Sequence, residues 1–184
     1  MNSDVEHFKI GIVLIGFKKN SRIDFLCKKL EGLFKNSECK IVGAQAIPEH
    51  SFDESRKQYN STKVLKELAI LAESIDSEKT LGITDVDLYV PGLNFVFGEA
   101  QLFGKVALIS TYRLEPKLYG ESNGSLFLQR MIKEAVHELG HTLGLEHCSN
   151  PKCVMHFSNS IHDTDLKDEN FCSNCKSKLR SLGF

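Results

Sequence analysis

Three histidines and one glutamate in the C-terminal third of the chain have the spacing of a catalytic metal site. His137, His141 and His147 follow the pattern H-E-x-x-H-x-x-G-x-x-H, with Glu138 beside the first histidine. Because residues i and i+4 lie on one face of a helix, His137 and His141 can present ring nitrogens to one ion. Gly144 can adopt a left-handed conformation that ends the helix and turns the chain back, so that His147 supplies a third ligand. Three protein ligands with one open position are typical of catalytic zinc.

Four cysteines form a second cluster directly after the third histidine. They make two short-spaced pairs, C-x4-C and C-x2-C, at Cys148, Cys153, Cys172 and Cys175. Such pairs suit a tetrahedral structural zinc, and two disulfides are the alternative. The first residues are polar and acidic, and the apolar run at residues 10–17 is too short for a secretory signal and lacks a cleavage site. A reducing cytoplasm then favours zinc, and Cys27 and Cys39, outside the cluster, are expected to be buried thiols.

The zinc-site pattern followed by a methionine, Met155, resembles the metzincin clan of metallopeptidases. The cysteines arranged as C-x4-C-x-M and then C-x2-C resemble one branch of that clan, the archaemetzincins. The resemblance covers residues 125–179, and the order of elements upstream is also similar. It implies a peptidase with two zinc ions, a catalytic one at the histidines and a structural one at the cysteines. It also implies that Met155 forms a tight turn beneath the histidines.

The residue types at the first site predict a hydrolytic reaction. Neutral histidines leave zinc its full charge, which lowers the pKa of a bound water, and Glu138 is placed to take that proton as a general base. No tyrosine occurs after Tyr119, so zinc or an upstream donor must stabilise the oxyanion that other metzincin branches stabilise with a tyrosine. His156 follows the third ligand closely and either lines the cleft or bonds to the backbone. A peptide-binding module without activity and a hydrolase of non-peptide amides are the alternative functions.

Composition limits the partners of the chain. In 184 residues, 23 Lys and Arg nearly balance 24 Asp and Glu, so neither nucleic acid nor an anionic membrane is indicated. No apolar run is long enough to cross a bilayer. We therefore expect a cytoplasmic monomer that acts on peptide or protein substrates.

Apolar periodicity predicts a mixed α/β fold similar to the metzincins, with a twisted mixed sheet, covering helices and a zinc helix as the floor of the cleft. The predicted strands are residues 9–17, 40–47, 80–84, 94–102 and 105–112. The predicted helices are residues 23–34, 61–74 and about 125–143, the last capped by Ser125. Residues 49–60 and 115–123 are predicted to be loops. Asp163, Asp165, Asp168 and Glu169 lack the spacing of a calcium loop and are predicted to form a solvated acidic loop.

We expect one catalytic domain over residues 1–184. Residues 1–144 form an N-terminal lobe that ends with the zinc helix, and residues 145–184 form a small C-terminal subdomain stapled by the four-cysteine zinc site. By position and by the resemblance, residues 96–102 are expected to be the antiparallel edge strand that pairs with an extended substrate. An ordinary hairpin strand is the alternative.

Overall fold

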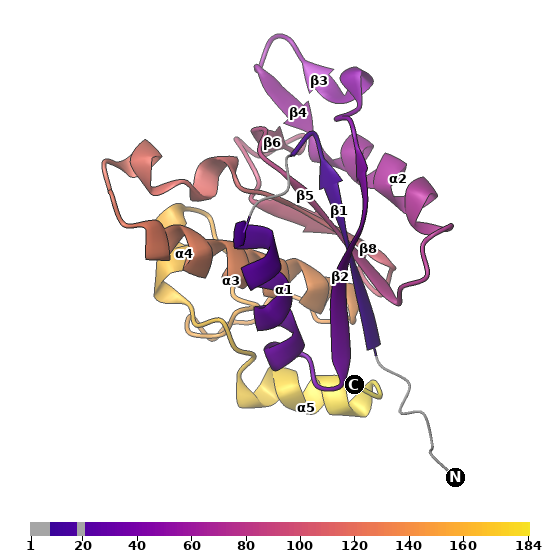
Figure 1. Cartoon of the computed structure of the whole chain (residues 1–184). Helices are drawn as coiled ribbons and strands as arrows, with labels where there is room; N and C mark the ends of the chain where they lie inside the picture. The colour runs from indigo at the N-terminus through magenta and orange to yellow at the C-terminus, as the bar shows by residue number, and fades with distance from the viewer. Residues whose placement is uncertain (1–7, 18–20) are drawn as a thin grey trace.

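A five-stranded sheet forms the centre of the computed structural model, which describes residues 8–17 and 21–184 (Figure 1). The strand order is β2-β1-β5-β8-β7. The first four strands are parallel, and β7 runs antiparallel to β8 at the edge. The strands are β1 (Phe8–Ile15), β2 (Ser37–Gln45), β5 (Lys79–Thr84), β7 (Gly98–Ala100) and β8 (Val106–Ser110). The predicted mixed α/β fold is confirmed, and residues 96–102 contain the antiparallel edge strand.

Helices cover both faces of this sheet, as the continuous burial of residues 10–15 on both faces of β1 requires (Figure 1). Ile10, Ile12 and Leu14 pack into one apolar cluster with α1 and α3, whereas Val13 and Ile15 pack into a second cluster with α2. The helices are α1 (Ser21–Leu33), α2 (Ser61–Ala72) and α3 (Gly124–Thr142). Of the described residues, none belongs to a helix long and apolar enough to span a membrane.

A second, three-stranded sheet replaces most of the loop predicted for residues 49–60. It has the order β3-β4-β6, from β3 (Phe52–Asp53), β4 (Gln58–Asn60) and β6 (Leu88–Tyr89), after the short helix η1 (Glu49–Ser51). The Asp53 carboxylate accepts hydrogen bonds from the backbone N–H groups of Ser55 and Arg56 and so closes the hairpin turn. The polar composition of this turn conceals the hairpin in the sequence.

Only the middle of residues 94–102 is a strand. Arg56 donates to the carbonyl oxygens of Leu93 and Asn94, both at 2.9 Å, and Gln58 donates to Asn94 O at 3.0 Å. These carbonyls are occupied by side chains of the β3–β4 hairpin, so the start of the segment forms no regular strand. The segment then pairs with β6 through a single bridge between Val96 and Leu88, and with β8 of the large sheet through β7.

The acidic segment near residue 165 is helical rather than a solvated loop. Ser160 and Asp163 form a capping box that starts α4 (Ile161–Leu166). Asp165 accepts two hydrogen bonds, each of 2.7 Å, from the fully buried guanidinium of Arg130 on α3. Lys133 donates to the carbonyl oxygens of Thr164 and Asp165. These bonds fasten α4 to α3.

The remaining elements are short helices and the C-terminal helix. They are η2 (Tyr112–Leu114), η3 (Pro116–Tyr119), which lies in the loop predicted for residues 115–123, and α5 (Ser173–Ser181). The end of the chain returns to the first strand, because the rings of Phe184 and Phe8 meet edge to face with centroids 6.1 Å apart. The C-terminal residues 145–184 therefore pack against the same side of the sheet as α1 and α3 (Figure 1).

Candidate metal centres

The helix that carries the first two histidines starts at Gly124. The Asn123 side chain, rather than the predicted Ser125, caps it by accepting a 3.0 Å hydrogen bond from Ser125 N. Its apolar face is buried against the sheet and α1 through residues that include Met131, Ala135 and Leu139. This packing holds the next face, with His137 and His141, toward the cleft.

The helix ends in a Schellman turn at Gly144, as the glycine predicts. Gly144 has φ +93°, its N–H donates to His141 O at 2.9 Å, and Leu145 N donates to Gly140 O at 3.0 Å. A Cβ on Gly144 would lie 2.1 Å from Cε1 of Phe103, so the position excludes a side chain for a second reason. The turn brings His147 back beside the helix.

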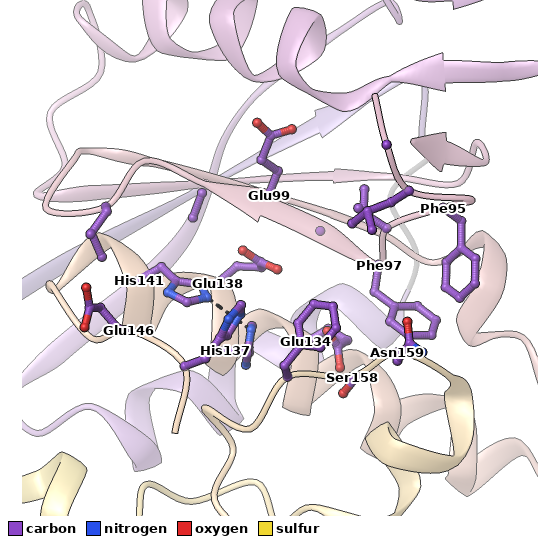
Figure 2. Close-up of a pocket in the computed structure, with 18 of the residues that line it drawn as sticks. Phe95, Phe97, Glu99, Glu134, His137, Glu138, His141, Glu146, Ser158 and Asn159 are labelled. Carbon is purple, nitrogen blue, oxygen red and sulfur yellow. Dashed lines mark hydrogen bonds between the residues drawn. The ribbon is translucent and has the colours of Figure 1, made fainter. Parts of the chain in front are cut away.

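The three imidazoles converge on one point. The Nε2 atoms of His137 and His141 lie 3.1 Å apart (Figure 2), and the ligand atoms of all three histidines lie within 4.8 Å of one another. His137 Nδ1 donates to Val154 O at 2.8 Å, and His141 Nδ1 donates to Leu145 O at 2.7 Å. Because a carbonyl only accepts, both Nε2 atoms carry lone pairs that face each other.

This donor set fits zinc. Nitrogen ligands at 2.0–2.1 Å in a tetrahedron are about 3.3 Å apart, close to the observed 3.1 Å. Burial lowers the pKa of His137, His141 and His147, and the ammonium of Lys167 lowers it further. The neutral imidazole that these shifts favour is the form that binds a metal.

Glu138 lies between the histidines and the edge strand. Its carboxyl is buried against β7, where a Cβ on Gly98 would be 2.7 Å from Oε1. Burial raises the pKa of Glu138 well above its ordinary value, and the neighbouring carboxylate of Glu134 adds to that shift. A cation at the histidines would favour the ionised carboxylate, because opposite charge stabilises it.

A cleft of about 760 Å³ opens over this site. Residues 92–100 and Leu102 form one wall, the cleft face of α3 forms the floor, and residues 157–159 form the opposite rim. Figure 2 shows the Glu138 carboxylate directed to β7, with His137 and His141 side by side below it.

The four cysteines meet as the spacing predicts. Cys148 and Cys172 have sulfur atoms 3.8 Å apart, and Cys153 and Cys175 have sulfur atoms 3.7 Å apart. All four lie within 4.8 Å of one another and are free thiols. Thiolates at about 2.3 Å from a tetrahedral zinc are about 3.8 Å apart, whereas a disulfide needs about 2.05 Å.

Their protonation also favours a cation. The backbone N–H of Cys175 and other hydrogen bonds lower the pKa of Cys172 to about 7. Burial raises the pKa of Cys153 and Cys175, so these two thiols ionise only when a positive charge offsets the desolvation. The cluster therefore fits a structural zinc.

The loop between the cysteine pairs also reaches the histidine site. Met155 is fully buried, and its sulfur lies so close to Gly140 that a Cβ there would be 2.5 Å away. Cys148 N donates to Met155 O at 2.9 Å, and His156 Nδ1 donates to Cys148 O at 2.9 Å. His156 therefore bonds to the backbone, which was one of its two expected roles. Cys27 and Cys39 are buried, as expected.

Sequence reasoning missed two buried charges beside the cleft. Glu134 lines it one helical turn before His137, and its Oε1 lies 2.9 Å from the Lys167 ammonium. The i−3 spacing from His137 could have identified Glu134. No local sequence pattern predicts that Lys167 is buried beside the cleft.

Comparison with known proteins shows where this arrangement occurs. The model of peptidase family M54 matches residues 35–181. The archaemetzincin of Methanocaldococcus jannaschii is 46% identical over 176 residues, which are 95% of this chain and 94% of that protein. The archaemetzincin of Pyrococcus furiosus is 45% identical, over 92% of this chain and 91% of that protein.

Two solved structures extend the comparison to three dimensions. The crystal structure of archaemetzincin from Methanopyrus kandleri has a TM-score of 0.84 at 34% identity, over 99% of this chain and 98% of that one. The archaemetzincin of Archaeoglobus fulgidus, complexed with malonate, has a TM-score of 0.80 at 41% identity, over 92% and 99% of the two chains.

Proposed function

Since this chain belongs to peptidase family M54 and is a zinc metallopeptidase, we propose that His137, His141 and His147 hold its catalytic zinc and that Glu138 is the general base. One observation carries this proposal: the Nε2 lone pairs of His137 and His141 face each other 3.1 Å apart while both Nδ1 atoms are committed to carbonyls. A metal ion between them would satisfy both nitrogens, and the cleft leaves its remaining side open.

The proposed mechanism assigns the proton transfers to Glu138. When zinc is bound, it lowers the pKa of a water molecule and polarises the scissile carbonyl group. Glu138 accepts a proton at its carboxylate, holds it in the buried site and delivers it to the departing amine. Val154 O and Leu145 O keep the two imidazoles oriented during this cycle.

The proposed substrate is an extended peptide along β7. As the edge strand, β7 has one side without a partner strand among the described residues, and this side borders the cleft. A peptide that adds there gains main-chain hydrogen bonds, and its side chains alternate between the cleft floor and solvent. The scissile carbonyl is then held over the histidines.

We further propose a second, structural zinc at Cys148, Cys153, Cys172 and Cys175, supported by sulfur separations of 3.7 and 3.8 Å. In this proposal residues 1–184 act as one catalytic domain. Residues 1–144 supply the lobe with the zinc helix, and residues 145–184 form the stapled subdomain. Six free thiols favour a reducing, cytoplasmic setting, and we propose a monomer.

The test is hydrolysis of a diverse peptide mixture by the zinc-loaded protein, with cleavage products identified by mass spectrometry. Glu138→Gln should abolish most cleavage while zinc content stays the same. Glu73→Gln, which removes an exposed carboxylate far from the cleft, is the matched control. Equal cleavage by Glu138→Gln and the parent protein would contradict the assigned base. Binding of peptides without any cleavage would support a capture module instead.

A further inference from the structure

One end of the cleft has a polar floor that the proposed reaction does not use. Glu134 and Ser158 line it, and Figure 2 shows both on the side of His137 that faces away from His141. Since Glu134 precedes His137 by three helical residues, it lies about 4.5 Å along the helix axis from that ligand. A substrate side chain next to the scissile bond would therefore reach this end.

The groups in this floor keep unused hydrogen-bonding capacity. Thr164 Oγ1 donates to Glu134 Oε1 at 3.1 Å, and the Lys167 ammonium lies 2.9 Å from the same oxygen, so neither contact uses Oε2. Ser158 Oγ is buried and has no hydrogen-bond partner among the described residues. A buried hydroxyl without a partner is unfavourable, and a ligand that bonds to it would remove that penalty.

The charge of the floor is balanced. Glu134 and Lys167 are both buried, with side chains 3% and 0% exposed, and their charges cancel. A lysine or arginine of the substrate would add a second cation beside the Lys167 ammonium. A substrate carboxylate would add a second anion beside Glu134. A neutral donor avoids both penalties, because it can donate to Glu134 Oε2 and accept from Ser158 Oγ.

The walls above this floor are aromatic. Phe95 and Phe97 stand edge to face with centroids 5.1 Å apart, and Phe157 faces them from the opposite rim. Phe95 is held in place by the Arg113 guanidinium, 4.3 Å from its centroid, and Phe157 by the His147 ring at 5.0 Å. Aromatic walls favour an aromatic side chain, which pairs with them edge to face or offset.

Building on the proposed peptidase function, we propose that this pocket, formed by Phe95, Phe97, Glu134, Phe157 and Ser158, is a specificity subsite that selects tyrosine. The tyrosine ring packs between the phenylalanines, and its hydroxyl donates to the Glu134 carboxylate and accepts from Ser158. Antiparallel pairing is the more stable mode for a peptide added to β7. Because β7 runs away from Phe97, an antiparallel peptide directs its C-terminal half to this pocket. The tyrosine is therefore the first residue after the scissile bond.

Two peptide series test the subsite. In the first, the residue after the cleaved bond is Tyr, Phe, Lys or Glu, and in the second the same four residues precede the bond. The parent protein should cleave the Tyr peptide of the first series with kcat/KM about 10- to 100-fold above the Phe peptide, because Phe leaves the polar floor unpaired. Ser158→Ala should reduce the Tyr-to-Phe ratio of kcat/KM severalfold. In the second series, neither the exchange of Tyr for Phe nor the Ser158→Ala substitution should change kcat/KM. Ser74→Ala, at an exposed serine on the far side of the sheet, is the matched control.

A binding measurement separates this proposal from the proposed catalysis. Dissociation constants of the Tyr and Phe peptides are measured by calorimetry with zinc-loaded Glu138→Gln, with and without Ser158→Ala. Tighter binding of the Tyr peptide that depends on Ser158 supports the subsite, even if the parent protein cleaves neither peptide and the proposed function fails. Equal affinity and equal kcat/KM for Tyr and Phe overturn the subsite and leave the peptidase proposal intact.

Discussion

Loss of the four-cysteine site should weaken zinc at the histidines, although no histidine is changed. The perturbation is Cys153→Ser, at a fully buried member of the proposed zinc site, directly before Val154. Val154 O accepts the 2.8 Å hydrogen bond that orients His137, and Met155 lies against the zinc helix at Gly140. Removal of the sulfur ligand frees this loop, so the hydrogen bond at His137 is lost or lengthened.

The expected loss of zinc affinity follows from the number of orienting hydrogen bonds that the substitution removes. One orienting partner of a metal-bound histidine is worth about 10- to 100-fold in metal affinity, so Cys153→Ser should lower catalytic-zinc affinity by that factor. Cys172→Ser removes the same metal site from outside the loop, so it should have an equal or smaller effect. His147 adds to the coupling, because it directly precedes the ligand Cys148.

The assay is competition for zinc with a chromophoric chelator, with fold monitored by circular dichroism. Cys39→Ser is the matched control, since it removes a buried thiol that lies outside the cluster. It should leave the affinity of the histidine site unchanged. Unchanged affinity in both Cys153→Ser and Cys172→Ser would refute the coupling and show that α3 and its turn fix the three histidines alone.

Three further outcomes are expected. Metal analysis of protein purified without added metal should approach two zinc ions per chain; His141→Ala should remove one and Cys172→Ser the other, whereas loss of the same single ion in both would contradict two sites. Glu138→Gln should lower kcat by about 10²- to 10⁴-fold with zinc content unchanged, and a normal rate would mean that another group is the base. Gly144→Ala should lower the free energy of unfolding by about 2–4 kcal/mol in chemical denaturation, from its positive φ and the contact with Phe103; full stability would show that the turn can relax.

The helix that carries His137 and His141, and the convergence of the histidines and of the cysteines, could be predicted because their determinants are local. His137 and His141 share a helix face through four-residue spacing, and Gly144 marks the reversal that returns His147. The cysteine pairs are likewise read from short spacings. Burial along β1 follows from a run of apolar residues that is independent of distant partners.

The parts that were wrong or missed depend on distant residues. Asp165 looks like a solvated acid until Arg130, 35 residues earlier, comes to lie beside it. Asn94 belongs to a segment with strand composition, yet its carbonyl accepts hydrogen bonds from the side chains of Arg56 and Gln58 and so is not available to a neighbouring strand. The predicted N-cap of α3, Ser125, was wrong, and Asn123 is the cap. Serine and asparagine both favour the N-cap position, and only the local geometry decides between them.

We expect the attachment of α4 to α3 to limit which substrates the proposed site can cut as well. Residues 157–159 lie between the cysteine cluster on one side and the α4 contacts of Arg130 and Lys133 on the other. Because this rim is held at both ends, we expect the width of the cleft to stay constant. If the substrate binds along β7 as proposed, only a backbone already released from its own fold can fit there. We therefore expect the rate at which an intact protein is cleaved to depend on how often its segments unfold locally, rather than on how many cleavable sequences it contains.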